Sequence, residues 1–260
     1  MIEKKGGFNM KSIIFRNAII LISLLMLVAI SACSSSDAER IAEEILPTTM
    51  ARAIHLSPDA PEVDVYFELI EVEQTVVGLN YGEASSYTEV SSGITKVIFK
   101  LASNGQEAAS LNDPAFAIDI DNTVYAVGLA ASLEIIQSED DRSTDPAKAK
   151  VRFVHASPDA PAVDVKIGDP AGTAVFANQS FKGVTDYALV DPGDYTFVVT
   201  QAGNNVDAVV TFEPVTLEVN TIYTVVARGT LEDTDDFDFG VRVFIDNGAG
   251  DTFVDLTVAP

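Results

Sequence analysis

RAIHLSPDAPEVDV, residues 52–65, recurs 100 residues later as RFVHASPDAPAVDV, residues 152–165, and ten of the fourteen positions are identical. A match of this quality at a fixed offset indicates an internal duplication. The same offset relates Tyr87, Val90 and Gly93 to Tyr187, Val190 and Gly193. Further on, Asn122-Thr123-x-Tyr125 matches Asn220-Thr221-x-Tyr223 at an offset of 98. The nearly constant offset predicts two domains of nearly equal length.

Apolar and polar residues alternate along both copies, which is typical of half-buried β-strands. The alternating apolar positions are Val63, Val65 and Phe67, then Val163, Val165 and Ile167, and in a third run Tyr195, Phe197 and Val199. Turn signals such as Ser-Pro-Asp-Ala-Pro, Asp191-Pro-Gly193 and Asp246-Asn-Gly248 separate the runs. We therefore predict an all-β protein with two tandem immunoglobulin-like antiparallel β-sandwich domains.

The N-terminus has the features of an export signal. An apolar run at residues 18–30 follows Lys11 and Arg16, and it is too short to span a membrane comfortably. The next residues complete Ile30-Ser31-Ala32-Cys33, which resembles the lipobox of bacterial lipoproteins, in which the cysteine is diacylated. The resemblance implies lipidation of Cys33, the only cysteine; the alternative is ordinary cleavage near Ala32 that leaves a free thiol.

These observations divide the chain into five parts. We predict a lipoprotein signal peptide at 1–32, a tether at 33–50, domain 1 at 51–137, a polar linker at 138–149 and domain 2 at 150–260. The expected location is outside the cytoplasm, with a membrane as partner through the lipid. In a Gram-negative cell, Ser34 after the cysteine favours the outer membrane; in a Gram-positive cell, we expect the outer face of the plasma membrane.

The chain is strongly acidic, with 39 Asp and Glu against 16 Lys and Arg and a net charge of −23 at pH 7. Without residues 1–32, which hold four of the basic residues and one of the acids, the net charge becomes −26. A body with this charge repels nucleic acid and anionic lipid, so we expect no nucleic-acid partner. Solubility explains the charge, and a dedicated cation-binding role is the alternative.

The repeated segment contains the residue types of a Ser-His-Asp triad. They are His55, Ser57, Asp59 and Asp64 in the first copy and His155, Ser157, Asp159 and Asp164 in the second. Each serine precedes a proline in a tight turn without a glycine-rich nucleophile elbow, and strand alternation places each histidine on an apolar face. We therefore predict no catalytic residue and no enzyme. In the structural role that we expect, the histidine fixes the following loop, and the serine and aspartate form turn bonds.

Metal binding is a second interpretation of these residues. One histidine and its neighbouring aspartates supply at most two ligands from one loop, so we predict neither a metal nor a cofactor there. Weak calcium candidates lie in a separate acidic stretch, at Asp233, Asp235, Asp236 and Asp238. That stretch lacks the Gly and Glu pattern of an EF-hand, so a solvated acidic loop is the expected state.

The segment HASPDAPAVDV of the second copy, with its variant HLSPDAPEVDV in the first, resembles the signature of a bacterial family known as domain of unknown function 4397. The resemblance covers essentially the whole chain after residue 50. It implies an exported, often tandem, immunoglobulin-like domain, and it brings no catalytic residue, ligand or cofactor.

Together these features predict a non-enzymatic envelope or cell-surface lipoprotein that serves as a spacer or interaction module for a protein or glycan partner. The alternative is a calcium- or glycan-binding adhesion module. Sugar-binding modules stack their ligands on exposed aromatic rings. The chain has no tryptophan, so a glycan site would depend on tyrosines such as Tyr66 or Tyr81.

Overall fold

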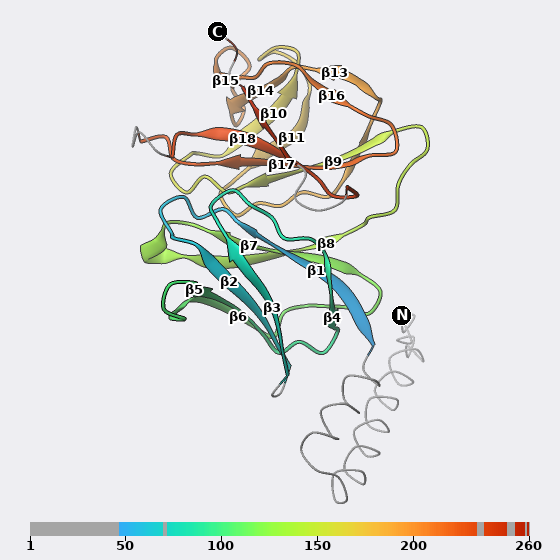
Figure 1. Cartoon of the computed structure of the whole chain (residues 1–260). Coiled ribbons are helices and arrows are strands. Elements are labelled where there is room, and N and C mark those ends of the chain that lie inside the picture. The colour runs from blue at the N-terminus through green and yellow to red at the C-terminus, as the bar shows by residue number, and fades with distance from the viewer. Residues whose placement is uncertain (1–46, 70–71, 233–236, 249–252, 258, 260) are drawn as a thin grey trace, which may run out of the picture. The chain divides into compact units, whose positions relative to one another are not determined.

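Strands build nearly all of the computed structural model, and they form two β-sandwiches (Figure 1). The structure describes residues 47–69, 72–232, 237–248, 253–257 and 259. Within these ranges, the 3₁₀ helix η1, Ala130–Ser132, is the only helical element, and no helix is long and apolar enough to cross a membrane. The predicted fold class is confirmed. The signal peptide and Cys33 lie outside the described residues.

The first sandwich contains two four-stranded sheets. One has the order β4-β1-β7-β8 and the other β3-β2-β5-β6. Their bounds are β1 Thr48–His55, β2 Val63–Leu69, β3 Val72–Leu79, β4 Thr88–Ser91, β5 Lys96–Leu101, β6 Glu107–Asn112, β7 Asp121–Val127 and β8 Glu134–Asp140.

The second sandwich repeats this plan with a fifth strand and an additional two-stranded sheet. Its main sheets have the orders β12-β9-β17-β18-β19 and β11-β10-β14-β15, and the small sheet pairs β13 with β16. Their bounds are β9 Ala149–His155, β10 Val163–Ile167, β11 Ala174–Gln179, β12 Ala188–Val190, β13 Gly193–Tyr195, β14 Phe197–Gln201, β15 Ala208–Thr211, β16 Val215–Leu217, β17 Ile222–Arg228, β18 Gly240–Ile245 and β19 Phe253–Leu256.

The first strand of each copy makes one antiparallel and one parallel pair. β1 pairs antiparallel with β4 through residues 48–51 and parallel with β7 through residues 51–55. β9 pairs in the same way with β12 and β17. The parallel pairs are an exception in the predicted antiparallel sandwich. Since they join residues about 70 positions apart, each first strand closes its own sandwich.

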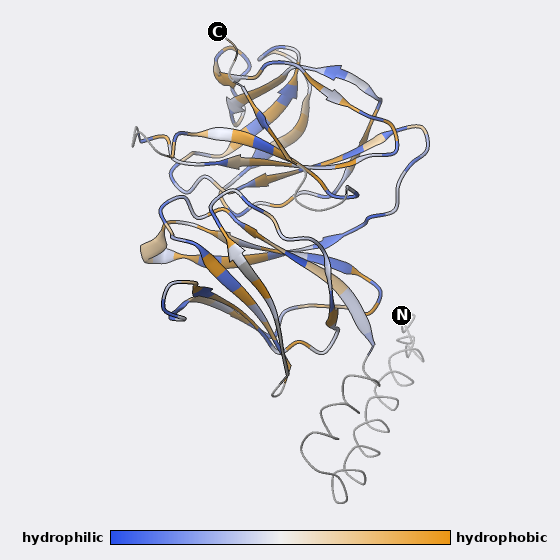
Figure 2. Cartoon of the chain, viewed as in Figure 1, coloured by the Kyte–Doolittle hydropathy of each residue, from blue (hydrophilic) through white to orange (hydrophobic). Residues whose placement is uncertain are grey.

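Each sandwich has its own core, built from the alternating apolar residues (Figure 2). In the first, Ala51, Ala53, Val65, Phe67 and Phe99 are at most 1% exposed. Along β2, Val65 and Phe67 alternate with the less buried Asp64, Tyr66 and Glu68, so the alternation predicted from the sequence corresponds to one face buried in the core. Residues 47–260, which include both sandwiches, form one compact unit.

Several strand bounds differ from the predicted divisions. β1 begins at Thr48, inside the predicted tether 33–50, because Thr48 and the next three residues pair with β4. β8 continues to Asp140, inside the predicted linker 138–149, because Asp140 pairs with Asp121. The predicted strand through Tyr195 and Val199 is divided at residue 196, where the chain passes from β13 into β14 of another sheet.

The predicted match of Thr123 with Thr221 is wrong. β1 pairs Arg52 with Thr123, and β9 pairs Arg152 with Thr224, so Thr123 corresponds to Thr224. The two alignments differ by three residues. In a strand an odd shift exchanges the two faces, so the structural alignment reverses which residues point into the core.

Candidate functional site

The two motif histidines are buried at the end of the first strand of each sandwich and fix the loop that follows. Nε2 of His55 lies 3.2 Å from the carbonyl oxygen of Pro61, and its Nδ1 accepts from the Ser57 amide at 3.3 Å. His155 makes the same 3.2 Å contact with Pro161. Burial lowers the pKa of both histidines below its ordinary value, which favours the neutral ring.

The first aspartate of each motif binds the backbone of a distant loop. Asp59 accepts from the Ala130 amide at 2.6 Å, at the start of η1. Asp159 accepts from the amides of Leu231 and Glu232 at 2.9 and 3.1 Å. Each carboxylate therefore joins its own motif loop to a loop about 70 residues later in the same sandwich.

The second aspartate has a similar role beside the strand that follows the motif. Asp64 accepts from the Gly78 amide at 2.9 Å. Asp164 accepts from the amides of Asn178 and Gly203 at 2.7 and 2.9 Å. These carboxylates therefore act as hydrogen-bond acceptors that fix the backbone of neighbouring segments.

The motif serines are not placed as nucleophiles in the described structure. Ser157 donates to Asp159 at 3.3 Å, and Ser57 Oγ is buried without a hydrogen-bond partner among the described atoms. Nδ1 of His155 also has no partner there. No serine–histidine bond of a triad is therefore formed in the described part of the chain.

The remaining predicted positions contribute no assembled site. Asp238 is exposed, whereas Asp233, Asp235 and Asp236 lie outside the described residues. Within the described ranges, no group of three or more His, Cys, Asp and Glu is placed to hold a metal ion. The two tyrosines considered for a glycan are both partly buried: Lys100 Nζ lies 3.8 Å from the centre of the Tyr66 ring, and Tyr81 packs on Phe237.

The most unusual chemistry lies between the sandwiches, where two buried ion pairs cross from one to the other. Arg52 of β1 donates to Asp246, after β18, at 2.6 Å. Arg152 of β9 lies 2.6 Å from Asp140, at the end of β8. The four side chains are at most 4% exposed. We call these four residues the ion-pair cluster.

Threonine and tyrosine hydroxyls complete the hydrogen bonds of the ion-pair cluster. Thr123 accepts from Arg52 at 2.9 Å and donates to Asp140 at 2.5 Å. Thr224 accepts from Arg152 at 2.8 Å and donates to Asp246 at 2.6 Å. Tyrosine hydroxyls also donate to the two aspartates at 2.7 Å, from Tyr87 to Asp140 and from Tyr187 to Asp246. Nearly every contact in one sandwich has its counterpart in the other.

Burial and charge have opposite effects on the pKa values in this cluster. Burial, the largest single effect, favours the neutral forms, but the surrounding charges and hydrogen bonds together outweigh it, so the pKa of Arg52 is raised and that of Asp246 is lowered. Burial raises the pKa of Tyr87 and Tyr187 well above its ordinary value, so both phenols stay neutral and act as donors. Arg52 and Asp246 are therefore ionised at neutral pH.

An apolar layer surrounds the cluster and completes the contact between the sandwiches. It includes Ile54, Leu56, Tyr125 and Val127 from the first and Val154, Ala156, Val226 and Phe244 from the second. These residues alternate with core residues along the same strands, so β1, β7, β9 and β17 are buried on both faces. This interface is distinct from the two sandwich cores.

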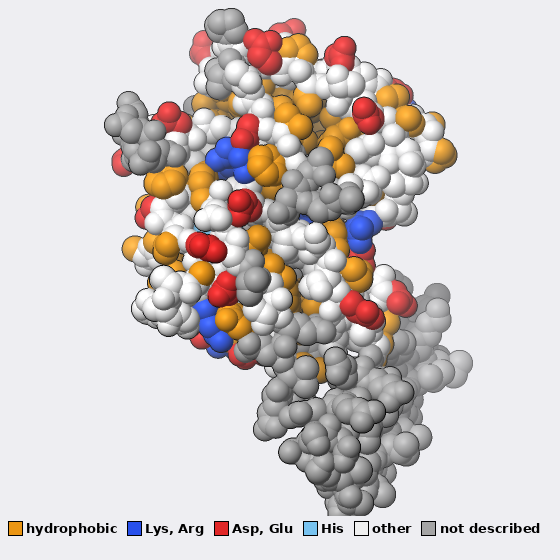
Figure 3. All heavy atoms as spheres, viewed as in Figure 1, with side chains coloured by type: hydrophobic (Ala, Val, Ile, Leu, Met, Phe, Trp, Pro, Cys, Tyr) orange, Lys and Arg blue, Asp and Glu red, His pale blue; other side chains and the backbone are white. Residues whose placement is uncertain are grey.

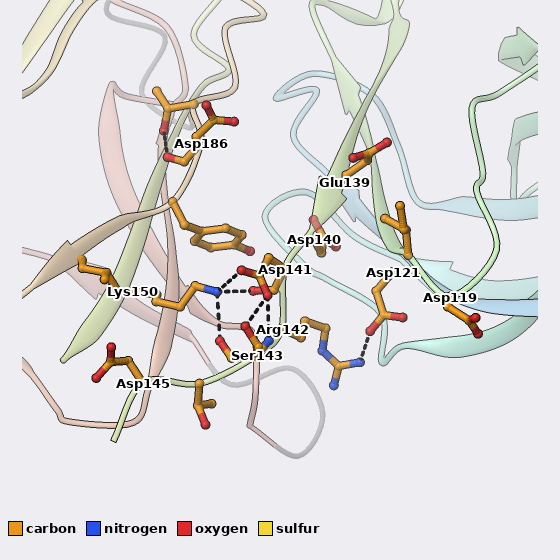
Figure 4. A pocket seen from close by; sticks show the side chains of 15 residues that line it. Asp119, Asp121, Glu139, Asp140, Asp141, Arg142, Ser143, Asp145, Lys150 and Asp186 are labelled. Carbon is orange, nitrogen blue, oxygen red and sulfur yellow. Dashed lines mark hydrogen bonds and ion pairs between the residues drawn. The ribbon is translucent and has the colours of Figure 1, made fainter. Parts of the chain in front are cut away.

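A pocket of about 970 Å³ lies beside the interface, lined by both sandwiches and the linker (Figure 4). Seven carboxyl groups and two cations belong to its wall. Arg142 donates to Asp121 at 2.8 Å, and Lys150 donates to the carbonyls of Asp141 and Ser143 at 2.8 and 2.9 Å. The hydrogen bond from Lys150, followed by that from Ser143, lowers the pKa of Asp141 to about 2. Both cations therefore hold the linker against the sandwiches.

Sequence reasoning missed the interface, although part of its signal was present. Arg52 and Arg152 are identical positions of the repeat, and so are Tyr87 and Tyr187. A charged residue repeated within an otherwise apolar strand is a signal for a buried ion pair. The aspartate partners have no such signal in the sequence. Asp140 lies in the polar stretch before domain 2, and Asp246 lies in an Asp-Asn-Gly turn.

The family model described as Domain of unknown function (DUF4397) matches the sequence twice, at residues 49–166 and 149–250. No curated protein matches. Among solved structures, the Bacillus anthracis TIE protein is similar at 14% identity with a TM-score of 0.24. That match covers 71% of this chain and 34% of the other, so the chain spans about a third of that protein's length.

Proposed function

We propose, since the chain belongs to the family described as Domain of unknown function (DUF4397), that it is a non-enzymatic lipoprotein of the cell envelope or cell surface. In this proposal the paired sandwiches serve as a spacer and interaction module, which presents loops to a protein or glycan partner. The observation that carries the proposal is the ion-pair cluster, because it joins the two sandwiches into one body of fixed geometry.

The contacts of the repeated motif support a structural role. Its histidines bind carbonyls of their own loops, and its aspartates bind backbone amides. Side chains that form hydrogen bonds with the backbone fix the conformation of the loops around them. The loops of a sandwich are the places where such folds carry recognition.

The surface charge fits a module that stands away from a membrane. Acidic side chains are scattered over the visible face in Figure 3 and do not form one patch. A net charge of −23 repels anionic headgroups and keeps the module soluble at a distance from them. In the proposal, lipid on Cys33 supplies the attachment, and residues 33–46 separate it from the first strand.

Two experiments test this proposal. Metabolic labelling with an acyl-chain analogue is expected to mark the wild-type protein and not Cys33→Ala, and Cys33→Ala is expected in the soluble fraction. Purified residues 47–260 are expected to leave peptidoglycan and envelope glycans intact. Release of soluble sugar or peptide products above a heat-denatured control would overturn the non-enzymatic assignment, and chemical crosslinking on intact cells identifies the partner.

A further inference from the structure

We infer that the face joining the two sandwiches is a docking surface for the equivalent face of a second copy of this chain. Through it, the first sandwich of one chain pairs with the second sandwich of another, and the reverse pairing closes the dimer. This inference concerns assembly and does not depend on the proposed spacer role.

The contacts across the interface are reciprocal, which is the property of an isologous interface. Strand register makes Arg52 equivalent to Arg152, since they pair with Thr123 and Thr224. β7 pairs Asp121 with Asp140, and the Asp246 amide binds the carbonyl of Ile222 at the same position of β17. Asp140 and Asp246 are therefore equivalent as well. Each face offers one arginine and one aspartate to the other.

The faces are specific for each other because of where these charges lie. A buried ion that meets no opposite charge costs several kcal/mol, so an unrelated apolar surface is a poor substitute. The apolar positions around the charges also correspond, for example Ile54 with Val154 and Leu56 with Ala156. The chemistry that this surface recognises is therefore a copy of itself.

One covalent connection crosses between the sandwiches in the described structure, the linker of residues 141–148. Eight residues span up to roughly 28 Å when extended, which gives the chain reach to open and pair elsewhere. The linker is held at its start by Lys150, whose Nζ lies 2.7 Å from the Asp141 carboxylate, and this carboxylate is 65% exposed. Lys150 also binds two carbonyls of the linker, and Arg142 binds Asp121, so pairing with a second copy takes place during folding, before these contacts form. Short connections of this kind are the hinges through which domains swap.

Charge reversal in two variants of residues 47–260 tests the inference. In Arg52→Asp, the new aspartate faces Asp246, and in Asp246→Arg, the new arginine faces Arg52. Each variant therefore has like charges at this position, whether the two sandwiches belong to one chain or to two identical chains. When the two variants are mixed, the exchanged heterodimer restores an Arg–Asp pair at both interfaces. We expect an equimolar mixture, unfolded and refolded together, to give a species of twice the single-chain mass by light scattering. Each variant refolded alone is expected to give none.

A second experiment covers the case in which a reversed charge prevents folding. A protease site replaces residues 143–147 of the otherwise native chain, and the protein is cut after folding. We expect the two halves to remain together at micromolar concentration and, when differently labelled preparations are mixed, to exchange halves between them. Halves that separate after cutting, or a mixture of folded charge variants that stays at single-chain mass, would overturn the inference.

Discussion

Arg152→Met is expected to destabilise residues 47–260 by about 3–5 kcal/mol, the usual cost of removing one partner from a buried ion pair. Arg152 is among the largest fully buried side chains of the protein. Its loss leaves the Asp140 carboxylate buried and without its ion-pair partner. It also removes the donors to Thr224 Oγ1 and Ser138 Oγ, each at 2.8 Å.

The equivalent substitution in the first sandwich is expected to destabilise the protein less. In Arg52→Met, Asp246 keeps a second arginine, Arg152, at 4.0 Å, whereas Asp140 in Arg152→Met keeps only hydroxyl donors among its described partners. The expected cost is therefore closer to about 3 than to 5 kcal/mol. Lys96→Met is the matched control, because its pair with Glu107 is 28% and 46% exposed and is expected to contribute at most about 1 kcal/mol.

Urea unfolding of the three variants, followed by linear extrapolation to water, gives the free energies of unfolding. Adding Asp140→Asn to Arg152→Met is expected to recover part of the loss, because the amide carries no charge that needs a partner. The reasoning is refuted if Arg152→Met costs no more than Lys96→Met, or if the second substitution makes the protein less stable still.

Three further predictions concern the repeated motif and the interface. The pKa of both histidines lies below its ordinary value of 6.5 in the folded state, so the unfolded chain binds more protons just below that pH. The contribution of the neutral histidines to the free energy of unfolding is thus fully present above about pH 6.5 and is lost on acidification. H55Q/H155Q is expected to abolish the resulting change in urea midpoint between pH 6.5 and 5. Asp164→Ala leaves two backbone amides without an acceptor, and Asp64→Ala leaves one. Asp164→Ala is therefore expected to lower the free energy of unfolding by about 1–3 kcal/mol more than Asp64→Ala, which calorimetry detects as a larger drop in Tm. Equal drops in Tm would contradict this. Gly82→Ala places a Cβ 2.5 Å from a guanidinium nitrogen of Arg242, at a φ of +81°. Urea unfolding is expected to show a loss of about 1–3 kcal/mol in the free energy of unfolding. An unchanged midpoint would show that the Arg242 side chain moves away freely.

The sequence was sufficient to predict the sandwiches because alternation and turn chemistry are local signals. Val63 and Val65 predict their strand without knowledge of its neighbours, and the repeat then extends the prediction to Val163 and Val165. The parallel pairing of β1 with β7 has no local signal. It joins Arg52 to Thr123, and no turn between them fixes the register.

The pairing within the ion-pair cluster could not be predicted for the same reason, although the repeated arginines are visible in the sequence. Arg52 and Asp246 are 194 residues apart, and Asp246 reads as part of an ordinary Asp-Asn-Gly turn. The repeat alignment that would have connected the halves was displaced by three residues at Tyr125 and Tyr223. Because this displacement is an odd number of residues, the sequence alignment matches side chains on opposite faces of equivalent strands. Tyr125 points into the interface, whereas Tyr223 points into a core.

The separation of Arg52 from Asp246 also sets an order of events when the chain is made. A polypeptide is synthesised from its N-terminus, and domains generally fold as units in that order. The first sandwich is complete once β8 has emerged, more than 100 residues before Asp246 exists. Until then Arg52 lacks the carboxylate of its ion pair, and the apolar residues around it face solvent. The two sandwiches therefore join only after the second has been synthesised, and a chain that ends before residue 246 cannot form the Arg52–Asp246 pair.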